Sequence, residues 1–209
     1  MLGLLQARYI DKVLEGFSIQ NSKKGLPPFR HRVPLSDDQR PKTQEEVDMM
    51  RQVPYASTMG SPMYAMLCAR PEICYLVGMV SQYQSNPGPK HWQAIKHIFK
   101  YLQRTRDYML VYQCEDLIPI GYTNSNFQSD LDFRKSTSGW VFTLGGGAIT
   151  WRNVKQSCIA DSTMEAKYVA ACEAAKEAVW LKKFLSDLGV VRIEQVPITL
   201  FCDTSGAVA

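Results

Sequence analysis

Hydrophobic periodicity divides the chain near residue 117. Before this point apolar residues recur every three or four positions, a spacing typical of one face of a helix. The pattern predicts a helix over residues 2–17, two apolar helices broken near Pro71, and a further helix over about 89–105. Residues 18–42 are polar and rich in proline, which indicates an extended loop. The first half is therefore predicted to be mostly helical.

Two capping boxes mark the beginnings of helices. Thr43 is followed three residues later by Glu46, and Ser162 is followed in the same way by Glu165. The second box opens a long alanine-rich segment that we expect to be helical until Gly189.

The pattern after residue 117 is that of strands. "LIPIGYT" is strand-like, and "GWVFTLGGGAITW" predicts a hairpin with a glycine turn at 145–147. "QSCIA" at 156–160 is expected to continue the sheet, and "VPITLFCD" predicts another strand that ends at Asp203. The fold class is thus α+β or α/β, with a helical region over 1–116 and a mixed sheet with packed helices over 117–209.

Charge is distributed unevenly between these two regions. The whole chain has 209 residues and a net charge of +4. The first 116 residues hold 15 Lys and Arg against 11 Asp and Glu, whereas the remainder holds nine of each. Attraction for phosphate groups is therefore expected in the first half. Six cysteines without a C-x-x-C pair, and no secretory leader pattern, favour a cytoplasmic or nuclear protein.

Four long strings of residues resemble a known family: "VPYASTMGSPMYAMLCARPEICYLVG", "NPGPKHWQAIKHIFKYLQRT", "RKSTSGWVFTLGGGAITW" and "QSCIADSTMEAKYVAACEAAKEAVWL". They are similar to the Pol polyprotein of copia-type (Ty1/copia) retrotransposons. The resemblance extends from the segment after the reverse-transcriptase palm through most of the RNase H domain. It implies a reverse-transcriptase tail over 1–116 and a ribonuclease H-like domain over 117–209 that is incomplete at its C-terminus.

The family's RNase H domain cuts the RNA strand of an RNA–DNA hybrid with two Mg²⁺ ions held by carboxylates. The resemblance places its carboxylate positions at Asn124, Lys167 and Asp203 in this chain. Only Asp203 is acidic, so the summed charge of the three positions changes from −3 to zero. A lysine ammonium repels a dication, and Asp203 alone is expected to be an insufficient metal ligand. We therefore expect catalysis to be lost and no Mg²⁺ to be bound.

A basic stripe provides a separate candidate for nucleic-acid binding. Lys96, Lys100 and Arg104 recur at intervals of four in the helix over about 89–105. They are able to contact phosphates without reading sequence, although a solvated helix face has the same pattern. Arg134 and Lys135 are further candidates, either for contact with a hybrid or for holding a loop.

Three functional hypotheses remain open from the sequence. The first is a catalytically inactive Pol segment with weak nucleic-acid binding. The second is an active RNase H with relocated metal ligands, and the third is a domesticated nucleic-acid-binding or interaction module. A nucleic-acid partner, the RNA–DNA hybrid, follows from the resemblance. No run of about 18 apolar residues predicts a membrane span, and no small-molecule substrate is evident.

Overall fold

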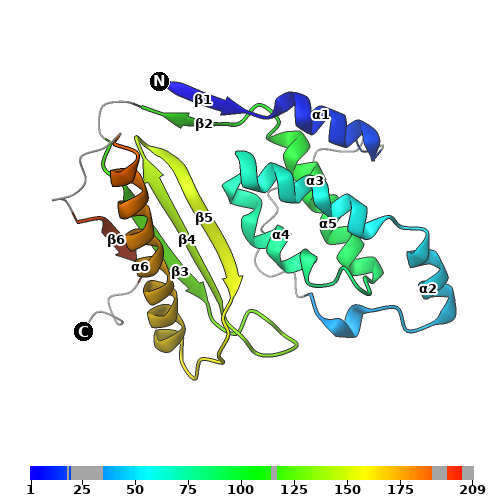
Figure 1. Ribbon diagram of the computed structural model, residues 1–209. Coiled ribbons are helices and arrows are strands. Elements are labelled where there is room, and N and C mark those ends of the chain that lie inside the picture. The colour runs from blue at the N-terminus through cyan, green and yellow to red at the C-terminus, as the bar shows by residue number, and fades with distance from the viewer. Residues whose placement is uncertain (18, 20–34, 114–116, 190–196, 204–209) are drawn as a thin grey trace. The chain divides into compact units, whose positions relative to one another are not determined.

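The computed structural model describes residues 1–17, 19, 35–113, 117–189 and 197–203 (Figure 1). They fall into two compact units. One comprises Leu4–Leu110, and the other comprises Met1–Gly3 with Val111–Ala209. The first is built from helices and the second from a four-stranded mixed sheet with a long helix packed on it, so the predicted fold class is confirmed.

The described residues of the helical unit form a buried cluster of apolar side chains. Its helices are α1 (Ala7–Gly16), α2 (Gln44–Arg51), α3 (Tyr55–Cys68), α4 (Cys74–Ser81) and α5 (Pro89–Arg104), with the 3-10 turns η1 (Asp37–Gln39) and η2 (Pro71–Ile73). The predicted break near Pro71 is the turn η2 between α3 and α4. Ile10, Met59, Val77 and Phe99 show that α1, α3, α4 and α5 all contribute to this core. The helical periodicity of the sequence therefore reports a real buried face.

The N-terminal helix is shorter than the sequence predicts. It begins at Ala7, because Leu2–Leu5 form strand β1, which pairs with β2 (Met109–Tyr112) in a two-stranded sheet. A short apolar run has no period of its own and is ambiguous between helix and strand. "LGLL" and "MLVY" are strands because they pair with each other across about a hundred residues of sequence. The sequence pattern predicted neither of them as a strand.

The second unit is a mixed sheet with one helix across one face (Figure 1). Its strands are β3 (Ile120–Asn126), β4 (Thr137–Leu144), β5 (Gly147–Lys155) and β6 (Thr199–Cys202), in the order β5-β4-β3-β6. β3 is antiparallel to β4 and parallel to β6. The parallel pair needs a long crossover, which includes α6 (Thr163–Asp187).

The hairpin turn depends on glycine. β4 ends at Leu144 and β5 begins at Gly147, as the triple glycine predicts. Gly145 has a φ of +56°, a conformation that side chains disfavour. A Cβ atom there would lie 2.1 Å from the carbonyl oxygen of Gln113, so no larger residue fits.

The prediction that 156–160 continue the sheet is wrong. After Lys155 the chain leaves the strand. The side-chain amide of the buried Gln156 donates to Ser138 Oγ at 2.9 Å and to the carbonyl oxygen of Ala166 at 2.8 Å. These bonds link the segment to β4 and to the first turn of α6. A pattern of apolar residues does not reveal such bonds, because they are made by a polar side chain.

Both predicted helix starts are confirmed. Thr43 Oγ1 accepts a hydrogen bond from the backbone of Glu46, whose carboxylate accepts one in return from the backbone of Thr43. Ser162 Oγ accepts from the backbone of Glu165 at 3.1 Å. The helix it begins ends before Gly189, which has a φ of +65°.

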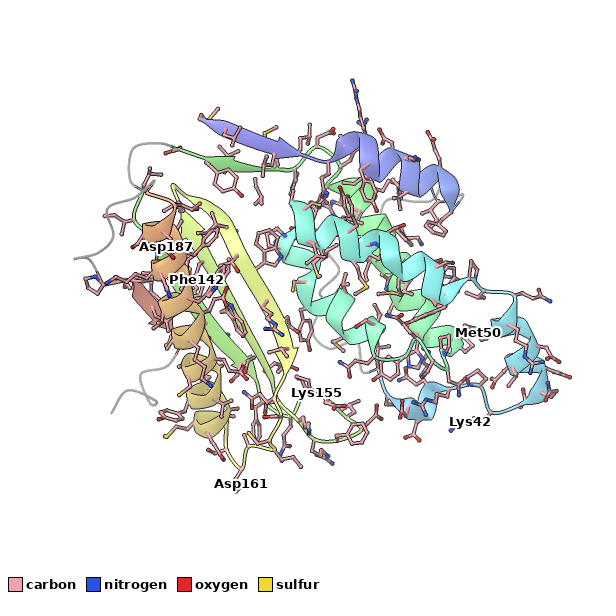
Figure 2. All side chains as sticks on the ribbon, viewed as in Figure 1. Lys42, Met50, Phe142, Lys155, Asp161 and Asp187 are labelled. Atoms are coloured by element: carbon pink, nitrogen blue, oxygen red, sulfur yellow. The ribbon has the colours of Figure 1, made fainter. Side chains whose placement is uncertain are left out.

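Packing of α6 on the sheet forms the core of this unit. Phe142, Ala174 and Leu181 are buried at this interface, and Figure 2 shows Phe142 between the strands and the helix. Trp180 lies outside this core, because its side chain is 55% exposed and stacks on Phe184.

Truncation of Phe142 is expected to destabilise the sheet unit strongly. The side chain is fully buried, so Phe142→Ala removes its packing and leaves a cavity that costs about 3–5 kcal/mol. Urea unfolding followed by circular dichroism measures this cost. Phe133→Ala is the matched control because Phe133 is 61% exposed, and an equal loss in both variants would contradict the assigned core.

An ion pair between α1 and the segment after α5 should make the stability of the helical unit depend on pH. Arg106 Nε and Nη2 donate to the two carboxylate oxygens of Asp11 at 2.5 and 2.6 Å. These bonds lower the pKa of Asp11 below its ordinary value of 3.8. A lowered folded-state pKa stabilises the fold above the unfolded-state pKa, and this stabilisation is lost as the pH falls through the folded-state value.

Asp11→Asn is therefore expected to lower the melting temperature at neutral pH. The difference from the unmodified chain should disappear in acid, where the wild-type carboxyl is also uncharged. Melting curves of both proteins across an acid titration measure this convergence. A gap in melting temperature that stays constant with pH would show that the ion pair does not stabilise the unit.

Candidate functional site

Three side chains from distant parts of the sequence meet at the end of the sheet. Asn124 lies on β3, Lys167 lies in the second turn of α6, and Asp203 follows the last residue of β6. In the parallel register, Thr123 is opposite Cys202, so the next residue on each strand falls at the same edge. The structure therefore brings together the three positions that the family resemblance selected.

Hydrogen bonds join these three residues directly. Lys167 Nζ donates to the main-chain carbonyl oxygen of Asp203 at 2.9 Å. Asn124 Nδ2 donates to Asp203 Oδ2 at 3.4 Å, and Asn124 Oδ1 accepts from the backbone of Ser125 at 2.7 Å. Lysine and asparagine thus make a polar cross-link between β3, α6 and the end of β6.

Thr123, the residue before Asn124 on β3, helps to fix the position of this cross-link. Its side chain is buried, and its hydroxyl lies 3.1 Å from the carbonyl oxygen of Gly139 on β4 and 3.3 Å from that of Ala170 on α6. Because Ala170 lies one turn after Lys167, the same contact that seats the helix on the sheet also places the lysine near Asp203.

The residues at this edge do not fit a pair of magnesium ions. Mg²⁺ prefers anionic oxygen ligands, but Asn124 is neutral and Lys167 is positively charged. The three formal charges sum to zero. The ammonium group of Lys167 lies within hydrogen-bonding distance of the Asp203 carbonyl oxygen. Within the residues that the structure describes, no three His, Cys, Asp or Glu side chains are grouped for metal binding.

Two acidic residues elsewhere in the unit, Glu165 and Asp130, already have other partners. The carboxylate of Glu165 accepts from the backbone of Asp161 at 2.7 Å, at the beginning of α6. Asp130 is buried, forms an ion pair with Lys155, and accepts from the backbone of Asp132. Movement of either carboxylate to the edge of the sheet would break these interactions.

The predicted basic stripe lies on the solvent-facing side of α5. Lys96 and Arg104 are exposed and Lys100 is half-buried. No hydrogen bond or ion pair joins any of the three to another described residue. By contrast, Arg51 and Arg106 are paired with nearby carboxylates. The charge of the stripe is therefore uncompensated locally, which fits both binding of a polyanion and a solvated surface.

His97 belongs to the same face, and the sequence interpretation did not include it there. Partial burial and the positive charges of Lys100 and Lys96 lower its pKa below the ordinary value of 6.5. The helix sequence PKHWQAIKHIFKYLQR also contains no Asp or Glu. The spacing of His97, three residues before Lys100 and seven before Arg104, is the signal that would have placed it beside the stripe.

The two candidates in the sheet unit differ from each other. Arg134 is exposed in the loop between β3 and β4, with a φ of +56°. Lys135 Nζ donates to the carbonyl oxygen of Ser157 at 2.9 Å, so this lysine links two loops. The geometry favours the loop-holding interpretation for Lys135, whereas Arg134 is exposed.

Comparison with known proteins gives relatives that include Pol polyproteins of transposons. No family model matches the chain, and no solved structure matches it. The chain is 44% identical over 207 residues to the retrovirus-related Pol polyprotein from transposon TNT 1-94 of Nicotiana tabacum, which is 99% of this chain and 15% of that polyprotein. It is 28% identical over 207 residues to the Pol polyprotein from transposon RE1 of Arabidopsis thaliana, covering 14% of it.

A third relative is much shorter. The secreted RxLR effector protein 161 of Plasmopara viticola is 43% identical over 133 residues, which are 63% of this chain and 94% of that protein.

The matches to polyproteins define a class that a mixed sheet with a polar edge could not define alone. The chain corresponds to a fragment of a retrovirus-related Pol polyprotein of a transposon. It spans about 15% of the length of the tobacco relative and corresponds to one segment of it.

Proposed function

We propose that this chain is a copia-type Pol segment in which a reverse-transcriptase tail precedes a ribonuclease H-like domain without nuclease activity. The relatives support a Pol segment. The order β3, β4, β5, α6, β6, with candidate ligands at the end of β3, in α6 and after β6, supports the ribonuclease H-like assignment.

The observation that carries the loss of catalysis is the hydrogen bond from Lys167 to Asp203. Hydrolysis by two metal ions requires several carboxylates around a space of about 4 Å, and here an ammonium group lies among them. Incubation of the purified chain with a labelled RNA–DNA hybrid in Mg²⁺ or Mn²⁺ tests this. Cleavage that is abolished by Asp203→Asn would support an active nuclease with relocated ligands instead.

The function that remains is weak, sequence-independent binding of an RNA–DNA hybrid by α5. Lys96, Lys100 and Arg104 follow one another at about 6 Å along the helix axis, and none is paired with a described carboxylate. Such cations bind the phosphate backbone by releasing counterions. The exposed Arg134 is a further phosphate contact in the sheet unit.

A second candidate function is that of a domesticated binding or interaction module. It is favoured by the Plasmopara viticola relative, because the match covers 94% of that protein. A sequence similar to 63% of this chain therefore makes up nearly the whole of that protein. Retention of partner proteins in the absence of nucleic acid would distinguish this function from hybrid binding.

A cytoplasmic or nuclear location is part of the proposal. It is supported by the free thiols among the described residues, which are Cys68, Cys74, Cys158, Cys172 and Cys202. Among the described residues, no helix has both the length and the apolar character needed to cross a membrane.

A further inference from the structure

We propose that His97 couples nucleic-acid binding to proton uptake, so that the affinity of α5 for a phosphate backbone rises as the pH falls. This inference rests on the proposed binding function and specifies how that same surface is regulated. It begins from the position of His97 on the helix.

His97 and the cationic stripe share one face. At 100° per residue, Lys96, Lys100 and Arg104 lie within about 80° of one another around α5, and His97 lies about 20° beyond Arg104. Buried positions such as Ile95, Ile98 and Leu102 occupy the opposite side. A phosphate backbone laid along the stripe therefore passes beside the His97 imidazole.

Within the described part of the chain, the charges that act on His97 are both positive. Lys100 and Lys96 are the charged groups that act on it, and both are on α5 itself; α1, α3, α4 and η1, which pack against α5, add no charge that shifts it. α5 contains no Asp or Glu, and no carboxylate of another described residue acts on the imidazole. His97 is therefore biased toward its neutral form in the free chain.

Bound phosphates reverse this bias. They neutralise Lys96 and Lys100 and add negative charge close to the ring, so the pKa of His97 is higher in the complex than in the free chain. By linkage, the chain takes up a proton on binding. The gain in affinity is complete below the free-chain pKa and is lost as the pH rises through the pKa of the complex. Each unit of difference between the two pKa values gives about tenfold in affinity.

Titration of an RNA–DNA hybrid by fluorescence anisotropy at low salt, between about pH 5.5 and 8, tests this coupling across the ordinary range of histidine. The unmodified chain should bind more tightly as the pH falls. His97→Gln should bind with an affinity that does not change with pH. His97→Arg should also be independent of pH but bind as tightly as the acidic wild type, because its charge is permanent.

The outcomes separate the two proposals. The same pH dependence in His97→Gln as in the unmodified chain, or binding that is independent of pH in all three proteins, overturns the role of His97 and leaves hybrid binding intact. Absence of binding by the unmodified chain at every pH overturns the binding function and the coupling together. Since His97 is exposed, both variants should keep the circular dichroism spectrum of the unmodified chain.

Discussion

The unmodified chain will bind no Mn²⁺ at the edge of the sheet and will leave an RNA–DNA hybrid uncut, whereas Asn124→Asp with Lys167→Glu will create a metal site. The double change alters the formal charge at the three positions from zero to −3. It also removes the ammonium group that lies 2.9 Å from the carbonyl oxygen of Asp203. Clustered carboxylates bind hard divalent cations, so isothermal titration should detect Mn²⁺ binding in the double variant only.

A matched pair of changes tests whether position matters rather than total charge. Asn86→Asp with Lys176→Glu alters the net charge by the same amount at exposed residues outside the site. This control should bind no Mn²⁺ at comparable concentrations. Equal metal binding by both double variants, or by the unmodified chain, would show that Asn124 and Lys167 do not determine the metal affinity of this edge.

The apo form of the double variant should also be less stable than the unmodified chain. Its three carboxylates repel one another where Lys167 and Asn124 now donate hydrogen bonds to Asp203. Added Mn²⁺ should restore the lost stability by binding the folded state. Melting curves with and without metal therefore give a second measurement that does not depend on catalysis.

Neutralising the stripe is the second change with a large expected effect. Lys96→Gln, Lys100→Gln and Arg104→Gln together should weaken hybrid binding by on the order of tenfold or more at low salt. The slope of log affinity against log salt concentration should become shallower by about 2.7, because three fewer phosphates are neutralised. Anisotropy titrations over a range of salt concentrations measure both quantities.

The control for this triple change removes three cations from another helix. Lys176→Gln, Lys182→Gln and Lys183→Gln on α6 lower the net charge by the same amount. If hybrid binding depends on α5, this control should keep most of the affinity and the salt slope. Equal losses in the two triple variants would mean that net charge, rather than the stripe, attracts the nucleic acid.

Local sequence signals were reliable where a residue's structure depends on its near neighbours. The helix starts at Thr43 and Ser162, the break at Pro71 and the glycine turn after Leu144 lie where the sequence predicts, although the Glu165 carboxylate accepts from the backbone of Asp161 and not from that of Ser162. Each depends on hydrogen bonds or dihedral angles within a few residues, so the sequence window contains the cause.

Predictions failed where a partner distant in the sequence determines the secondary structure or the burial of a residue. Leu2–Leu5 is a strand because Met109–Tyr112 lies beside it, and residues 156–160 leave the sheet because Gln156 bonds to Ser138 and Ala166. Trp180 is a large apolar residue of α6, yet its side chain is 55% exposed. An apolar pattern records that a side chain can be buried, and only packing determines whether it is.

The sequence by itself determined the family resemblance, the fold class and the identity of the residues at the candidate site. The tertiary structure alone decided that Asn124, Lys167 and Asp203 meet through hydrogen bonds, and that no described carboxylate pairs with the cationic stripe beside His97. The physical reason is that residue type sets the charge a position carries, whereas the strength of an electrostatic interaction depends on the distance between charges, which only the folded chain defines.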